Sequence, residues 1–191
     1  MNPSQTIWLV RHGETAWSLS GQHTGRTDLP LLPQSAPALK ALRPHLQHPF
    51  ALVLSSPLKR AQETARLVGF ESFELDNNLM EWNYGDYDGK TKEDIKKLVP
   101  GWSIWAQGVP HGETLEEVAG RARQVIQRAQ ALSGDVALVG HGHILRILAA
   151  CWLGIPPANA EHLALSTGSI SVLAFEDDYP VLARWNWQPD D

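Results

Sequence analysis

Short apolar runs divide the chain and predict the strands of a sheet. Residues 6–10, 51–55 and 136–139 are aliphatic or β-branched at almost every position, which is typical of strands buried on both faces. Residues 70–75 are a weaker candidate for a further short strand. Near the carboxyl end, apolar and polar positions alternate in residues 169–175 and again in 181–185, which predicts a hairpin at one edge of the sheet.

Helical periodicity separates these strands. Apolar side chains recur three and four residues apart in residues 35–46, 58–68 and 115–132. Ser35 can cap the first of these segments, and Thr114 with Glu117 forms a capping box ahead of the third. Alternating strands and helices indicate an open α/β sheet, which binds its ligands beyond the carboxyl ends of the strands.

Length and composition fit one globular domain over residues 1–191. The chain is 43% hydrophobic, which is ample for the core of one domain or of one domain with an added lobe. Its net charge of −5 argues against a general binder of nucleic acid or of anionic membranes. The single cysteine, Cys151, excludes an internal disulfide. The amino end carries no signal-like segment and no window reaches membrane-spanning length, so we expect a soluble, cytoplasmic protein.

Two of the predicted strands run directly into a histidine. Arg11 and His12 follow the first strand, and His141 with Gly142 follows the third, so all are expected at the same crevice. An arginine fork can hold two phosphate oxygens, and a neighbouring imidazole can attack phosphorus or donate a hydrogen bond to it. Gly13 is expected to let the backbone approach the ligand closely. Alone, an arginine next to a histidine is more often an ordinary surface feature. Residues elsewhere in the chain are therefore needed to indicate a phosphate-binding site.

Two kinds of partner are present. Arg60 lies in the first turn of the segment 58–68, where it can reach the crevice beside a helix amino terminus that attracts anions. Glu81 is the preferred proton donor, because a carboxyl group held near phosphate charge can have its pKa raised enough to protonate a departing alkoxide. Asp86 and Asp88 compete for this role, although they lie in a turn of ordinary polar composition.

Loops supply weaker candidates. Residues 16–33 are rich in Gly, Pro, Ser and Thr, and Ser18, Thr24 and Gly25 of this loop can line the crevice. The segment around residues 82–112, with a short helix and two tryptophans, is a candidate lid.

A metal site is the alternative interpretation of two histidines. His141 and His143 are two residues apart, but no matching cysteine or acidic cluster accompanies them, so no metal is expected. We expect His143 to cap or pack instead.

Five motifs, in order, resemble the histidine phosphatase superfamily, also called the phosphoglycerate mutase-like family. They are Arg11-His12-Gly13-Glu14-Thr15, the stretch 55–65 that contains Arg60, Glu81, Gly112-Glu113-Thr114, and Gly140-His141-Gly142. The resemblance covers nearly the whole chain. One motif would be weak, but five in order at fitting positions make chance improbable.

The resemblance implies a three-layer α/β/α sandwich with a mostly parallel central sheet, to which the predicted hairpin adds an antiparallel edge. It also implies a phosphohistidine intermediate on His12 and a phosphate pocket of Arg11, Arg60 and His141. Glu81 would act as proton donor and acceptor, and neither a metal nor another cofactor would be needed.

Departures from the family pattern bear on the substrate. Ser18 stands where many members have asparagine, and the glycolytic mutases have an arginine after the acid where this chain has Trp82. Those mutases also carry a longer insertion before the second histidine. Both of the latter differences favour a phosphatase acting on small phosphomonoesters such as sugar phosphates. The expected substrate-binding residues are Ser18, Thr24, Gly25, Tyr84 and Gly142.

The sequence leaves two alternatives to a phosphatase. They are phosphoryl transfer of the cofactor-dependent phosphoglycerate mutase type, and a weakly catalytic module that binds phosphorylated ligands. The expected partner is a small phosphorylated metabolite rather than nucleic acid or membrane, and the expected state is a monomer or homodimer.

Overall fold

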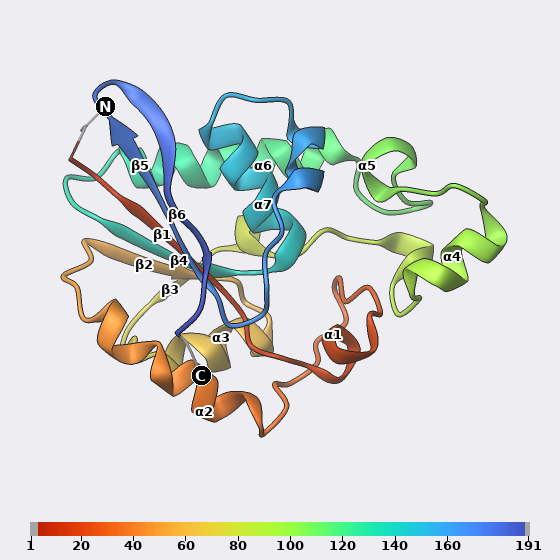
Figure 1. Ribbon diagram of the computed structural model, residues 1–191, viewed down its shortest axis with the longest axis horizontal. Helices are drawn as coiled ribbons and strands as arrows, with labels where there is room; N and C mark the ends of the chain where they lie inside the picture. Colours follow the sequence, from red (N-terminus) through yellow and green to blue (C-terminus); the bar gives the residue numbers. More distant parts are fainter. Residues whose placement is uncertain (1–3, 190–191) are drawn as a thin grey trace.

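A six-stranded sheet forms the centre of the molecule (Figure 1). The computed structural model describes residues 4–189. The strands are β1 (Ile7–Arg11), β2 (Leu52–Ser55), β3 (Glu74–Leu75), β4 (Val136–Gly140), β5 (Ile170–Glu176) and β6 (Tyr179–Trp187), and they lie side by side in the order β3-β2-β4-β1-β5-β6. The first four run parallel, whereas β5 and β6 form an antiparallel hairpin next to β1. The predicted edge hairpin is therefore confirmed.

The predicted strand over residues 70–75 is mostly wrong. Only Glu74 and Leu75 pair with β2. Phe70 is buried and packs edge-on against Phe50, with ring centroids 5.7 Å apart, so the chain joins the sheet only after this contact.

Alternation along the strands builds two cores. Ile7 and Leu9 of β1 belong to the core on one face of the sheet, and Val10 belongs to the core on the other face. β4 alternates in the same way and is buried at every position. A strand buried on both sides needs helices on both faces.

Helices cover both faces of the sheet (Figure 1). α2 (Ser35–Ala41) and α3 (Lys59–Leu67) pack on one side, and α6 (Leu115–Gln130) and α7 (Gly142–Trp152) pack on the other. The three-layer α/β/α sandwich is thus confirmed. The short elements are α1 (Ala16–Ser20), η1 (Arg43–Leu46), η2 (Asn77–Leu79), η3 (Gly85–Tyr87), α4 (Lys92–Leu98), α5 (Ile104–Gln107) and η4 (Pro157–His162).

Of the two predicted helix caps, one is confirmed and one is wrong. The backbone N–H of Glu117 donates to Thr114 Oγ1 at 3.2 Å, and the backbone N–H of Thr114 donates to Glu117 Oε2 at 2.7 Å, which completes the capping box of α6. Ser35 is instead the first residue inside α2, and its hydroxyl donates to the carbonyl of Glu14 at 3.1 Å.

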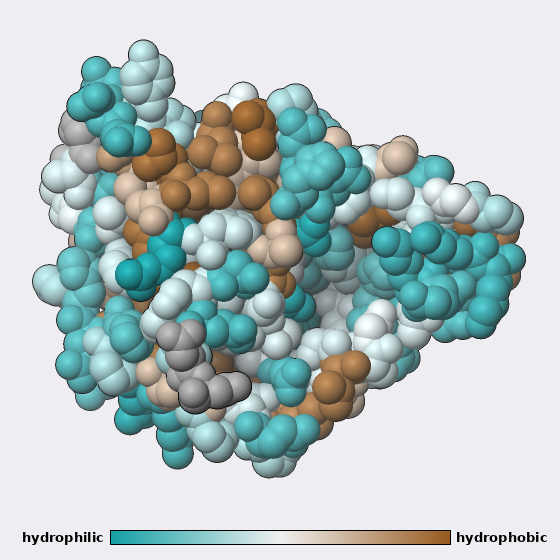
Figure 2. Space-filling view, viewed as in Figure 1, coloured by the Kyte–Doolittle hydropathy of each residue, from teal (hydrophilic) through white to brown (hydrophobic). Residues whose placement is uncertain are grey.

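The segment 82–112 projects from the body and carries α4 and α5 (Figure 1). Hydrophilic residues dominate the face of α4 that is visible in Figure 2. On its inner side Trp82, Ile95 and Trp102 are buried. Its base is joined to the loop after α1, because the backbone N–H of His23 donates to the carbonyl of Lys90 at 2.9 Å. This attachment makes the segment a wall of the site; its closing as a lid stays a prediction.

Within residues 4–189, none of the helices combines the length and the apolar character that crossing a membrane requires. The amino-terminal residues 1–3, on which part of the signal-segment argument rests, lie outside the described range.

Two glycines should respond in opposite directions to alanine. A Cβ at Gly112 would lie 2.2 Å from the carbonyl oxygen of Asn83, so Gly112→Ala forces apart two backbone segments at the base of the projecting segment. We expect it to lower the free energy of unfolding by about 1–3 kcal/mol. Gly120, inside α6, has no atom within 4 Å of its would-be Cβ, and Gly120→Ala should raise the same free energy by about 0.5–1 kcal/mol. Urea unfolding followed by circular dichroism measures both, and equal effects would contradict the close approach at Gly112.

Candidate active site

A pocket of about 210 Å³ opens beyond the carboxyl ends of β1 and β4. The register of the two strands places Arg11 opposite Gly140, so His12 and His141 follow side by side, with ring centroids 5.1 Å apart. Seven of the predicted residues line the pocket: Arg11, His12, Ser18, Thr24, Glu81, Tyr84 and Gly142. The other three, Gly25, Arg60 and His141, support it from behind.

His12 has one ring nitrogen held and one available. Its Nδ1 lies 2.6 Å from the carbonyl oxygen of Gly13. Because a carbonyl only accepts, Nδ1 carries the proton and Nε2 carries the lone pair. Burial lowers the pKa of His12 well below 6.5, and the charges of Arg11 and Arg60 lower it further. His12 is therefore a neutral imidazole that can act as a nucleophile through Nε2.

Gly13 serves packing rather than ligand approach, contrary to the sequence expectation. A Cβ at Gly13 would lie 2.8 Å from Leu39 Cδ1, so the glycine allows α2 to pack against the end of β1. Its backbone N–H is bonded to the hydroxyl of Thr64 at 3.1 Å.

Arg11 is a half-buried cation with an unused hydrogen-bond donor. Its Nη1 donates to the carbonyl of Leu165, while its buried Nε has no hydrogen-bond partner among the described residues. A Cβ on Gly142 would lie 3.4 Å from Arg11 Cζ, an ordinary contact distance, so the guanidinium lies directly beside this glycine. A desolvated guanidinium with an unused donor is suited to a phosphoryl oxygen.

Arg60 is fully buried and held by main-chain carbonyls. Its Nη2 donates to Thr24 and Gly25, at 3.0 Å and 2.9 Å, and its Nη1 donates to Thr27 at 3.0 Å. These bonds fix the cation and also shape the loop after α1. Thr24 itself lines the pocket.

His141 is bonded within the protein at both ring nitrogens. Arg60 Nε donates to its Nδ1 at 3.1 Å, and because a guanidinium cannot accept, the ring proton lies on Nε2, which is 2.8 Å from Ser56 Oγ. Burial lowers the pKa of His141 well below 6.5, assisted by the charge of Arg60, so the ring is neutral. In this arrangement His141 positions Arg60, and its predicted donation to a phosphoryl oxygen stays a prediction.

Gly25 and Asp88 act together as structure. A Cβ at Gly25 would lie 2.8 Å from the carbonyl oxygen of Trp82, so no larger residue fits there. Asp88 accepts the backbone N–H of Gly25 at 2.7 Å and the hydroxyl of Thr27 at 2.6 Å. Asp86 pairs with His111 at 2.9 Å on the exposed side of the segment. Neither aspartate lines the pocket, which leaves Glu81 as its carboxylate among the described residues.

Glu81 is a buried carboxylate at the amino terminus of α7. It accepts the backbone N–H groups of Trp82, His143 and Ile144, at 2.9, 3.0 and 3.0 Å. Burial raises the pKa of Glu81, but His143 and the three N–H donors outweigh burial and lower it overall. The protein's own groups therefore lower this pKa, which the sequence did not reveal, and the expected rise beside a bound phosphoryl group stays a prediction.

Arg121 and Glu113 fasten the chain that carries Glu81. Arg121 of α6 donates to the carbonyls of Asn78 and Met80, at 2.7 and 2.9 Å, and forms an ion pair with Glu113 at 2.8 Å. Glu113 also accepts the backbone N–H of Asn83 at 2.8 Å. The Gly112-Glu113-Thr114 motif therefore serves the position of Glu81 rather than contact with a ligand.

Sequence reasoning missed six pocket-lining residues, of which three carry basic side chains: His23, His143 and Arg146. His143, expected to cap or pack, both packs and lines the pocket, and its Nδ1 lies 2.6 Å from the phenolic oxygen of Tyr84. Burial lowers its pKa to about 3, so it is neutral. Arg146 follows Gly142 by four residues on α7, one helical turn, and this spacing is a signal that could have placed it on the same face.

Ser18 lines the pocket but is also engaged in a helix cap. Its hydroxyl donates to the carbonyl of Thr15 at 3.0 Å and accepts the backbone N–H of Thr15 at 2.8 Å. In the described part of the chain, no three His, Cys, Asp or Glu side chains lie close enough together to hold a metal ion.

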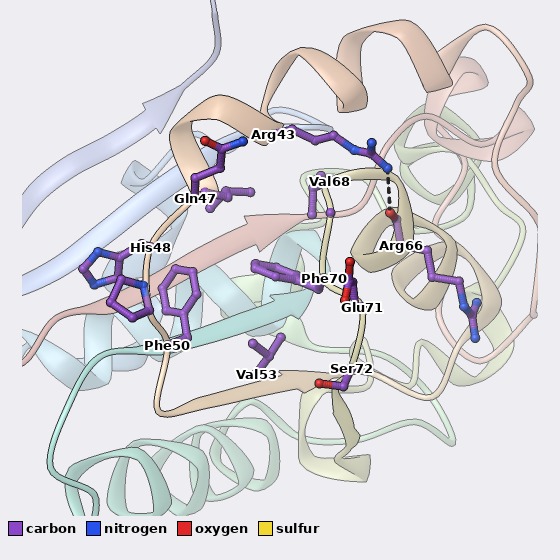
Figure 3. A pocket seen from close by; sticks show the side chains of 13 residues that line it. Arg43, Gln47, His48, Phe50, Val53, Arg66, Val68, Phe70, Glu71 and Ser72 are labelled. Atoms are coloured by element: carbon purple, nitrogen blue, oxygen red, sulfur yellow. Dashed lines mark hydrogen bonds between the residues drawn. The ribbon is translucent and has the colours of Figure 1, made fainter.

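A larger hollow of about 790 Å³ lies elsewhere, between η1, β2 and the end of α3 (Figure 3). Phe50, Phe70 and Val53 form its floor, and Arg43 and Arg66 lie at its rim. Arg43 donates hydrogen bonds to the backbone carbonyls of Arg66 and Leu67. His48 and Glu71 also line this hollow, but His48 Nε2 is paired with Asp135 Oδ2 at 2.5 Å. None of the predicted site residues lines it, so we assign the chemistry to the smaller pocket.

Comparisons with known proteins agree with this site. The chain is 37% identical over 182 residues to an acid phosphatase of Mycobacterium tuberculosis, covering 93% of this chain and 90% of that protein. It is 33% identical over 184 residues to a sedoheptulose 1,7-bisphosphatase of Saccharomyces cerevisiae, covering 77% and 67%. The solved structure of an open reading frame of Mycobacterium tuberculosis superimposes with a TM-score of 0.92 at 34% identity, covering 96% of this chain and 98% of that one.

Residues 7–188 match the family described as histidine phosphatase superfamily (branch 1). This match spans the sheet, the helices on both of its faces and every residue that lines the pocket. The chain belongs to the histidine phosphatase superfamily, and it is a phosphoric monoester hydrolase of that superfamily.

Proposed function

We propose that the protein hydrolyses small phosphomonoesters, such as sugar phosphates, without a metal and through a phosphohistidine on His12. The observation that carries this proposal is a neutral imidazole with its Nδ1 fixed by the Gly13 carbonyl, beside the fully buried Arg60 and the half-buried Arg11. A pocket of about 210 Å³ suits a small metabolite. The two relatives described above are named for different activities, so neither name decides the substrate.

The reaction has two transfers. Nε2 of His12 attacks phosphorus, the N–P bond forms, and the bond from phosphorus to the leaving oxygen breaks while that oxygen takes a proton from Glu81. Water then attacks the phosphohistidine, Glu81 accepts a proton from that water, and the N–P bond breaks to release phosphate. Arg11 and Arg60 stabilise the charge on the phosphoryl oxygens in both steps.

Glu81 must gain its proton before the first step, because its own surroundings lower its pKa. A bound phosphoryl group is a nearby negative charge, and a like charge favours the protonated acid. A substrate that binds as its monoanion also brings a proton with it, since the second pKa of a phosphomonoester is about 6. His12 stays unprotonated below pH 6.5, because burial and the neighbouring arginines lower its pKa, so the nucleophile is preserved under the conditions that load the acid.

His12 should become phosphorylated during turnover, even in the presence of EDTA. A rapid acid-free quench with labelled substrate should trap an adduct that is labile to acid and stable to alkali, as expected of a phosphoramidate. His12→Ala should form none, whereas His162→Ala, which removes an exposed histidine of η4, should form as much as the natural chain. Equal labelling of the His12→Ala protein would refute the assignment, and loss of labelling with EDTA would refute metal independence.

Glu81→Gln should impair poor leaving groups most. General acid catalysis typically contributes about a hundredfold to ten-thousandfold. We expect a loss of kcat in that range on a sugar phosphate, and a clearly smaller loss in the single-turnover phosphorylation step with p-nitrophenyl phosphate, whose phenolate leaves without a proton. Asp86→Asn, which removes an exposed carboxylate of the same segment, is the matched control and should leave both rates unchanged. Equal losses for the two substrates would mean that Glu81 positions the substrate instead.

A further inference from the structure

Arg146 lines the pocket together with Arg11, and the proposed reaction does not use it. It lies on α7, one helical turn beyond Gly142, and its side chain lines the pocket together with His23 and His143. It is half-buried, and burial lowers its pKa from the usual value. A charge kept in such a place needs compensation.

The guanidinium of Arg146 is fixed by the protein. Nε donates to the carbonyl of Ala160 at 3.0 Å, and Nη2 donates to the carbonyl of Glu161 at 3.1 Å, both from η4. Its Cζ lies 4.8 Å from the centre of the Trp105 ring, a cation–π contact from the projecting segment. A long side chain that three contacts hold at one pocket wall is pre-organised for a ligand.

No carboxylate neutralises Arg146 by contact. Among residues 4–189, no Asp or Glu oxygen lies within 4.0 Å of its guanidinium nitrogens, and the carboxylate of Glu161 pairs with His162 instead. Arg26 and Arg121, by contrast, both form ion pairs with Glu113. Nη1 of Arg146 donates no hydrogen bond within the described residues.

In the proposed reaction, the positive charge of Arg146 is not matched by any negative charge of the phosphoryl group. Arg11 and Arg60 match the two negative charges of a phosphoryl dianion. When Glu81 holds the proton that it will donate, it is neutral, and His12 and His143 are neutral as well. One positive charge then remains on the pocket wall, on Arg146.

We propose that Arg146 forms a second anion subsite, which selects phosphomonoesters whose carbon skeleton carries another anionic group, a carboxylate or a second phosphate. This inference rests on the proposed phosphatase function, and it names the class of substrate. A carboxylate and a phosphate both present oxygen atoms with negative charge, and the fixed guanidinium group of Arg146 can donate hydrogen bonds to either.

Matched substrate pairs test the preference directly. 3-Phosphoglycerate and glycerol 3-phosphate differ in a carboxylate against a hydroxymethyl group. Propane-1,3-diol bisphosphate and its monophosphate differ in a second phosphate against a hydroxyl. In assays of phosphate release, kcat/KM should be about tenfold to a hundredfold higher for the member that carries the additional anionic group, in at least one of the two pairs. The pair that shows this difference identifies whether Arg146 binds a carboxylate or a second phosphate.

Variants locate the preference at Arg146. Arg146→Gln should abolish it, mainly by raising KM for the member with the second anion, whereas the member without one should change less than about threefold. Arg146→Lys keeps the charge without the fork and should retain part of the preference. Arg66→Gln, which removes an exposed arginine of α3, controls for the change in net charge and should keep the full preference.

Three results would overturn the inference, and they differ from failure of the function itself. The natural chain could treat both members of each pair alike, a measurement that needs no variant. Arg146→Gln could lose activity equally on both members, which would make Arg146 structural. Arg66→Gln could lose the preference as well, which would make it an effect of overall charge. If no substrate and no p-nitrophenyl phosphate were hydrolysed, the proposed function would fail, and this inference would fail with it.

Discussion

Two arginines beside a neutral imidazole, one fully buried and one half-buried, are the constraint on which the rest of this structure depends. Like charges repel, and burial removes the water that would screen them, so Arg11 and Arg60 are costly to hold together. The fold offsets this cost with backbone carbonyls: Leu165 receives Arg11, and the loop after α1 bends so that Thr24, Gly25 and Thr27 receive Arg60. Burial lowers the pKa of His12, and the same two charges lower it further. The closely spaced positive charges lower the stability of the fold, and the same charges suit the site to a phosphoryl group.

The parallel register of β1 and β4 brings this arrangement together. Arg11 lies opposite Gly140, so the residues that follow both strands meet at one edge of the sheet although they are far apart in the sequence. α7 begins at that edge, and its first backbone N–H groups hold Glu81. Nucleophile, cations and acid thus share one scaffold of strands and one helix start, which is more rigid than a site built on loops alone.

The sequence predicted those parts of the site that depend only on residues close together in the chain. An apolar run that ends in Arg11-His12, and another that ends in His141-Gly142, can be interpreted without knowing which strands are neighbours. The parts that depend on packing could not be predicted. Gly13 was assigned to ligand approach because its contact with Leu39 exists only once α2 has packed. Glu81 was identified by its motif, but its pKa is lowered chiefly by His143, more than sixty residues later, and also by the backbone N–H groups of His143, Trp82 and Ile144. Arg146 was visible only as one more arginine on a helix.

The central claim is that phosphorus is attacked first by His12 and only then by water. The stereochemical course of the reaction tests it most directly, because each in-line displacement inverts the configuration at phosphorus. A phosphomonoester made chiral with oxygen isotopes would be turned over in the presence of an alcohol that competes with water, and the configuration of the new ester would be determined by phosphorus NMR. Two displacements through His12 predict overall retention; overall inversion would mean a single direct attack and would contradict the account.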